Sequence, residues 1–204
     1  EMSASLVGSE MCIRDRLNLL SQNFRFINDV GAECEDNAAA EILQLFIGGN
    51  ETYTGTKTTL LGRQSNLDLN VGYYCKDEQL LDMNYVAEHI GKKTVSSMNA
   101  GGVLRDKAHK LFRGTIDFQL GSSGAKGDEN EDVLILGEDV INQTVPLILC
   151  AEEDVEGNHG ASIGRPSDDV LFYLASRGLD EEEACNLMAV SYTHLRAHET
   201  SAHL

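Results

Sequence analysis

Residues 67–83 read LDLNVGYYCKDEQLLDM, and two runs of alternating apolar and polar residues flank a short charged break. Alternation with period two is the pattern of a β-strand that buries one face. Similar short apolar runs occur at 24–27, 41–47, 111–112, 115–118, 133–136 and 145–149. Residues 38–47 could form a helix on propensity alone, but we interpret them as a strand because their neighbours are strands and Gly48 and Gly49 end the run sharply.

The apolar runs are separated by turn residues, at 48–50, 101–102, 121–127 and 137–139. Strands at this spacing are typical of a β-sandwich, a β-barrel or a β-solenoid. No crisp hexapeptide repeat is visible, so the alternation alone leaves these three architectures open.

The pattern becomes helical after Gly164. Ser167 can cap a helix over 168–176, and Gly178 stands where a left-handed C-terminal cap is expected. Asp180 and Glu183 form a capping-box pattern that opens a second helix. The apolar residues of the two helices are Val170, Leu171, Leu174 and Ala175, then Ala184, Leu187 and Met188. We expect this helical segment to be truncated and the natural protein to be longer.

The composition excludes several classes of protein. The 204 residues are 42% hydrophobic and 24% charged, which is typical of a globular domain. A formal net charge of −17 argues against binding to nucleic acid or to an anionic membrane surface. No stretch approaches the roughly 20 apolar residues of a membrane span, and no signal peptide is visible. The five cysteines are scattered, which favours a reduced, cytoplasmic chain.

The two ends differ from the rest of the chain. Residues 1–16 show neither helical nor strand periodicity, and residues 190–204 break the acidic character of what precedes them. Both resemble translated sequencing-adapter sequence, so we interpret them as artefactual segments. Removing them discards His194 and His198, whose spacing of four residues would suit zinc. The strand-rich core is then 17–164, and the helical segment is 165–189.

Two weaker motifs favour ordinary structural roles. The run Gly91–Thr94 resembles the end of a phosphate-binding loop, but the glycine expected five positions earlier is Val86, so a turn with solvated lysines fits better. The acidic run 128–132 lacks the alternating ligands and central glycine of a calcium loop, so we expect a solvated acidic turn.

The segment 150–164 carries the strongest chemical signal. An apolar strand ends at Cys150, an acidic stretch follows, and His159 lies between Gly157 and Gly160. Thiolate and imidazole are ligands suited to iron, zinc or copper(I). The alternative is that Cys150 is a small buried hydrophobe and His159 a turn residue.

The chain from about 61 to 189 resembles the SufB/SufD family of iron–sulfur cluster assembly scaffolds. The resemblance is carried by NHGASIG at 158–164 and LFYLASRGL at 171–179, with further matches at 89–94, 110–117 and 130–136. It implies a mainly β protein: a right-handed parallel β-helix, or β-solenoid, followed by a short helical segment. It also implies a non-catalytic scaffold that pairs with a SufB-like subunit and a SufC-type ATPase.

The resemblance further implies which residues act. Val140 stands where SufB-like members carry a functional cysteine, so the chain resembles the SufD-like partner, in which the histidine matching His159 lies at the subunit interface. Some SufD-like proteins have a cysteine where this chain has Gly157, and Cys150 could substitute for it. The expected interface residues are therefore His159, Cys150, Asn158 and Gly160, with His159 as the metal ligand.

We expect a transient iron–sulfur cluster or iron ion at the subunit interface, and no cofactor bound tightly by the isolated chain. Phe172, Tyr173 and Arg177 are the residues expected to dock the ATPase, and the exposed edge of the β-helix could also pair two copies of the chain. The alternatives are a β-helical carbohydrate-active enzyme or acyltransferase, and a purely structural β-solenoid. An enzyme would need convergent catalytic groups on successive strands, and we identify no such set.

Overall fold

The computed structural model describes residues 2–8, 11–21, 23–180, 183–184 and 187, and its strands form two six-stranded parallel sheets. The first sheet has the odd-numbered strands in chain order: β1 (Met2–Gly8), β3 (Arg25–Cys34), β5 (Glu51–Leu60), β7 (Leu80–His89), β9 (His109–Phe118) and β11 (Ile141–Cys150). The second has the even-numbered strands: β2 (Met11–Asn18), β4 (Ala39–Ile47), β6 (Asn66–Cys75), β8 (Val95–Arg105), β10 (Ala125–Leu136) and β12 (Val155–Gly164).

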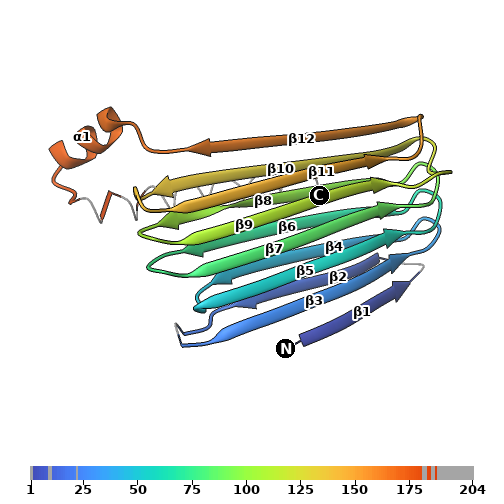
Figure 1. The fold of residues 1–204 in the computed structure, drawn as a ribbon, viewed down its shortest axis with the longest axis horizontal. Coiled ribbons are helices and arrows are strands. Elements are labelled where there is room, and N and C mark those ends of the chain that lie inside the picture. The colour runs from blue at the N-terminus through green and yellow to red at the C-terminus, as the bar shows by residue number, and fades with distance from the viewer. Residues whose placement is uncertain (1, 9–10, 22, 181–182, 185–186, 188–204) are drawn as a thin grey trace.

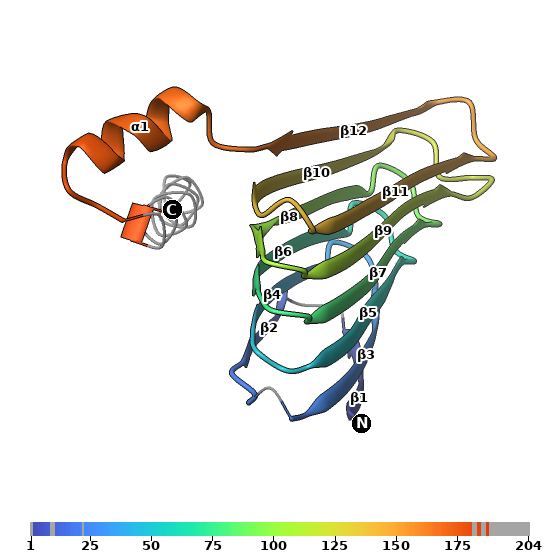
Figure 2. The same cartoon turned by 60° about the vertical axis from the view of Figure 1, so that its left-hand side comes forward.

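The chain crosses between the two sheets after every strand, so one odd and one even strand make one coil (Figure 1). Each strand pairs in parallel with the strand one coil away; Leu80 pairs with His109, and His109 with Ile141. Consecutive strands of a sandwich or meander would instead pair as antiparallel hairpins. The fold is therefore a parallel β-solenoid, as the family resemblance implies, and Figure 2 shows the stack of coils from the side.

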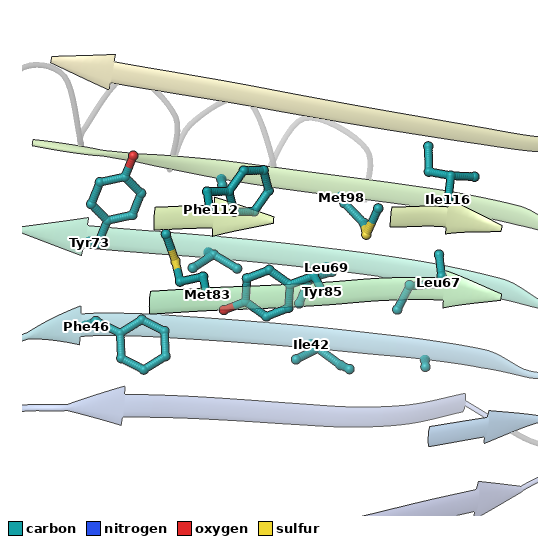
Figure 3. Close-up of a cluster of buried hydrophobic side chains, with 14 of the residues drawn as sticks. Ile42, Phe46, Leu67, Leu69, Tyr73, Met83, Tyr85, Met98, Phe112 and Ile116 are labelled. Atoms are coloured by element: carbon teal, nitrogen blue, oxygen red, sulfur yellow. The ribbon is translucent and has the colours of Figure 1, made fainter. Parts of the chain in front are cut away.

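Alternation within each strand fills the space between the sheets. The even strands contribute Ile42, Leu69 and Met98, and the odd strands contribute Met83 and Phe112, all nearly inaccessible to solvent (Figure 3). Since parallel pairing keeps each side chain on the same face as its partner, the inward residues form rows that run along the stack of coils.

One corner of the solenoid repeats the same turn in successive coils. Asn37, Gln64 and Lys93 have φ between +56° and +59°, and Gly124 occupies the same place with φ +77°. The backbone N–H of Asn37 donates to the carbonyl of Arg63 at 2.9 Å, one coil further on, and the next coils repeat this bond. The chain therefore repeats a corner conformation once per coil, and it does not repeat a hexapeptide sequence.

Several expectations about turns are wrong. Gly101, Gly102 and Gly127 lie within strands β8 and β10. Gly102 is required there because a Cβ would overlap the backbone and ring of Tyr73. The acidic run 128–132 also lies in β10, where Glu129 and Glu131 are buried.

The expectation that residues 1–16 have no strand periodicity is also wrong, because β1 and most of β2 lie there. The runs at 41–47, 67–71 and 145–149 are strands as expected, and 91–94 is a turn with exposed lysines.

The helix α1 (Asp168–Ser176) follows β12 and has the expected caps. The backbone N–H of Val170 donates to Ser167 Oγ at 3.4 Å, and Gly178 has φ +91°. Asp180 and Glu183 make the reciprocal bonds of a capping box, at 2.8 and 3.0 Å. Figures 1 and 2 place α1 beyond the end of β12 and away from the stacked coils.

Several sequence expectations lie outside the described residues. These are the remainder of the second helix, Met188, His194 and His198.

His89, at the end of β7, is fully buried within the family-like segment 89–94. Its Nδ1 lies 2.7 Å from Thr94 Oγ1 and its Nε2 lies 2.9 Å from Ser96 Oγ, and its ring packs on Phe118. Burial lowers the pKa of His89 to about 4. The imidazole is therefore neutral at physiological pH and ties the strand end to the following corner.

We expect acid to destabilise the fold through His89. Its pKa is below the ordinary value of 6.5, so the native state binds fewer protons than the unfolded chain between pH 6.5 and about 4. The free energy of unfolding should fall over that interval by up to about 3 kcal/mol. Urea unfolding across this range should show a flatter profile for His89→Gln; an equally steep profile in the variant would contradict this assignment.

Candidate functional site

The last coil, β11 and β12, is the open end of the solenoid, since β10 and β9 are each covered by one further strand and no strand follows β12 in the described residues. Paired residues share a face, so Val155, Gly157, His159, Ala161 and Ile163 face inward above a buried row of β10. On β12, however, all of these except Val155 are exposed. Their inward faces are open because none of the described strands is stacked on them.

The positions across this coil show what His159 faces. A Cβ on Gly157 would lie 3.0 Å from Ile148 Cγ2 and from Phe118 Cε2, so Gly157 lies opposite Ile148. Strands β11 and β12 run in opposite directions, so His159, two residues after Gly157, lies opposite Pro146, two residues before Ile148 (Figure 1). By the same alignment, Cys150 lies across from Val155, at one end of the coil.

Cys150 and His159 are therefore separated by about four residues along the strand direction, or roughly 13 Å. Cys150 is exposed rather than a buried hydrophobe, and His159 lies in a strand rather than a turn. The structure does not bring Cys150 beside His159 in place of a cysteine at 157.

Asn158 and Gly160 lie on the opposite face of β12 from His159. The side-chain amide of Asn158 donates to Asp128 Oδ1 at 3.0 Å on the outer surface. A Cβ on Gly160 would lie 3.0 Å from Asn130 Oδ1, on that same surface. These two residues thus frame the strand that carries His159 but do not share its inward face.

Glu129 lies directly beneath His159 in the inward row, as its register partner on β10. It is 3% exposed, and its Oε2 has no hydrogen-bond partner. Desolvation, with a smaller contribution from neighbouring Glu131, raises the pKa of Glu129 to about 7. The carboxylate lies against Gly114 on the opposite sheet, where a Cβ would overlap it.

Glu131 is the second buried carboxylate, and it is fully engaged. Lys110 Nζ forms an ion pair with its Oε1, Thr144 Oγ1 donates to its Oε2 at 2.5 Å, and the Tyr73 hydroxyl lies 3.4 Å from Oε1. Both charged side chains of the pair are essentially inaccessible to solvent. Desolvation lowers the pKa of Lys110, and Glu131 opposes that shift.

Sequence reasoning missed Lys110, Glu129 and Glu131. The signal was available in the alternation: Val133 faces inward, and stepping back by two along β10 places Glu131 and then Glu129 on the same face. The charge of the two glutamates argues against placing them inside, because charged residues are seldom buried unless they are paired.

The acidic loop after Cys150 is tied to the corner beneath it. Ser123 Oγ donates to Asp154 Oδ2 at 2.7 Å, and the Gly121 N–H donates to Glu152 Oε2 at 3.0 Å. Lys126 forms an exposed ion pair with Glu156. The acidic side chains of this loop are solvated, and those of Glu152 and Asp154 are bonded to the corner below.

The residues expected to dock the ATPase are accessible. Phe172 and Tyr173 are 77% and 54% exposed, and the Arg177 guanidinium lies 5.2 Å from the centre of the Tyr173 ring. A groove of ≈ 290 Å³ follows the apolar side of α1, lined by Leu171, Phe172, Ala175, Leu179, Asp180 and Ala184.

Within the part of the chain that the structure describes, no cluster of three or more histidine, cysteine, aspartate and glutamate side chains forms a metal site. Cys34 and Cys75 are buried, and burial raises the pKa of each thiol, to about 11 and about 12. Among the described helices, none is long and apolar enough to cross a membrane.

We expect Lys110→Met to destabilise the protein by about 3–5 kcal/mol, because it leaves Glu131 buried without its counter-charge. Adding Glu131→Gln should restore most of that loss. Urea unfolding of the two single variants and the double variant measures the coupling. A double variant as unstable as Lys110→Met would show that the cost arises from lost packing instead.

Gly114→Ala should cost about 1 kcal/mol, because its methyl group displaces the Glu129 carboxylate, which is the end of a flexible side chain. In a Glu129→Ala background the same substitution should cost clearly less, since the overlapping atoms are gone. Thermal unfolding of the four chains tests this. Equal costs in both backgrounds would mean that Glu129 does not occupy the space against Gly114.

Comparisons with known proteins show the family to which the chain is similar. The family model described as "SUF system FeS cluster assembly, SufBD core domain" matches residues 14–192. The chain is 32% identical to the iron–sulfur cluster assembly protein SufD of Bacillus subtilis over 144 residues, covering 71% of the chain and 30% of that protein. It is 25% identical to SufB of the same organism over 160 residues, covering 78% of the chain and 34% of SufB.

SufD of Escherichia coli is 26% identical over 175 residues, covering 86% of the chain and 41% of that protein. The chain thus spans between 30% and 41% of the length of these relatives. The higher identity to SufD than to SufB of Bacillus subtilis supports a SufD-like member. With a family match over most of its length and a parallel β-solenoid fold, this chain belongs to the SufB/SufD family of iron–sulfur cluster assembly proteins.

Proposed function

We propose that this chain is part of a SufD-like, non-catalytic scaffold subunit that works in the cytoplasm with a SufB-like subunit and a SufC-type ATPase. Membership of the family supports the general role in iron–sulfur cluster assembly. The partners, the absence of catalysis and the location are the parts that we propose. In this role the cluster or its iron is cargo, and the protein supplies ligands and an interface.

The observation that carries the proposal is the position of His159. It is an exposed imidazole on the inward face of the last coil, at the end of the solenoid where another subunit could approach. A neutral imidazole is a good ligand for iron, and its other ring nitrogen can be held by an acceptor nearby. His159 would thus present one nitrogen to iron at an interface between subunits.

The last coil also offers a surface for a SufB-like subunit. The outward side chains of β11 include Ile141, Val145, Leu147 and Leu149, which are 43–51% exposed. An apolar row on the last strand of a sheet, next to unpaired backbone groups, is a surface that a partner strand can cover. A second copy of the chain could use the same edge, which gives the homodimer that we also expect.

The helix α1 supplies the surface that we assign to the ATPase. Phe172 and Tyr173 project from it with large exposed areas, beside the groove along its apolar side. Exposed aromatic side chains of this kind are typical anchors at protein interfaces.

The test is cluster assembly with the partners present. The chain, its SufB-like subunit and the ATPase are purified together, and cluster formation is followed anaerobically by absorbance. We expect His159→Ala to lower the cluster yield several-fold while the complex still elutes as one species. Ser162→Ala is the matched control, because Ser162 lies on the same strand but on its outer face.

An unchanged yield in His159→Ala, with the complex intact, would remove His159 from the proposed role. Failure of the three proteins to co-purify would count against the partnership itself.

A further inference from the structure

One carboxylate oxygen of Glu129 is buried without a hydrogen-bond partner among the described residues, although burial of a carboxylate normally requires one. Its Oε2 makes no hydrogen bond, and only 3% of the residue is exposed. The register places Met98 beneath it and His159 above it in the same inward row. An unpaired acidic group between an apolar floor and an imidazole is costly to keep for stability alone.

Glu129 reaches across the coil, and its carboxylate lies against Gly114 on the opposite sheet, one row below His159. Gly114, on the opposite sheet, has no side chain, and a Cβ there would fill the place of the carboxylate. In the row above, the neighbours of His159 on the same face are Gly157 and Ala161, which are small. On the β12 side, therefore, His159 is the one large polar side chain above Glu129.

The other candidate groups near this end are already engaged or too distant. Both oxygens of Glu131 are held, one by Lys110 and the other by Thr144. Cys150 lies at the far end of the coil, about four residues along the strand from His159. Glu129 and His159 are thus a carboxylate and an imidazole that are adjacent by register, and one oxygen of that carboxylate is unpaired among the described residues.

We propose that Glu129 and His159 together bind one divalent cation at the open end of the solenoid, with Glu129 as the inner ligand. This inference rests on the proposed function, in which the cation is the Fe²⁺ that enters cluster assembly. A carboxylate oxygen and an imidazole nitrogen form a ligand pair that Fe²⁺ accepts readily. Water or the neighbouring subunit supplies the remaining ligands, and the cation supplies the positive charge that the buried carboxylate lacks.

The experiment measures binding of Co²⁺, a redox-stable substitute for Fe²⁺, to the full chain. Titration calorimetry gives the affinity, and the visible absorption of bound Co²⁺ reports its ligand field. We expect Glu129→Gln and His159→Ala each to weaken binding about tenfold or more and to change the spectrum. Asp128→Asn, on the same strand but the outer face, should bind within about twofold of the wild-type chain.

The outcomes separate this inference from the proposed function. Loss of binding in His159→Ala with unchanged binding in Glu129→Gln would overturn the role of Glu129 and leave His159 in place. An unmodified chain that binds no Co²⁺ would overturn the paired site, while the cluster-yield assay reports on the scaffold role independently. Circular dichroism confirms that each variant is folded, and Glu129→Asp provides a second variant that keeps the charge but shortens its reach.

Discussion

The register between successive coils decides which side chains meet in this protein. Each strand pairs in parallel with the strand one coil away, so a residue is stacked on its partner about 30 positions along the chain, as Glu129 is on His159. The repeated corner at Asn37, Gln64 and Lys93 maintains that register by hydrogen-bonding each coil to the next. The core rows and the candidate site both follow from this one constraint.

Most of the strands can be predicted from alternation, whereas the solenoid architecture is implied by the family resemblance. The strands around 41–47 and 67–71 bury apolar side chains at every second position, which is the pattern that sequence reasoning detects. The run 128–132 follows the same alternation, but two of its inward side chains are carboxylates. Its high charge therefore predicts a solvated turn where the structure has a strand. Gly102 predicts a turn from sequence alone. Its actual role is to let Tyr73 of the neighbouring strand approach closely, and that contact cannot be seen in the local sequence.

The candidate site is harder to predict, because residues that are adjacent in the sequence of a strand point to opposite faces of the sheet. Asn158 and Gly160 flank His159 in the sequence, yet alternation turns them to the outer face. Cys150 is only nine residues away but lies at the other end of the coil. Glu129, a full coil earlier, is the true neighbour. The family motif identifies His159, whereas only the register identifies the residue beneath it.

The exposure of the last coil links the stability of the fold to its proposed role. Two other buried polar groups, His89 and Glu131, are held by hydrogen bonds or by an ion pair. At the open end, His159 is uncovered, and one oxygen of Glu129 is unpaired. A subunit that covers this end removes water from both groups and so strengthens their attraction for a cation. Binding of a partner and binding of iron would then be thermodynamically coupled, each favouring the other.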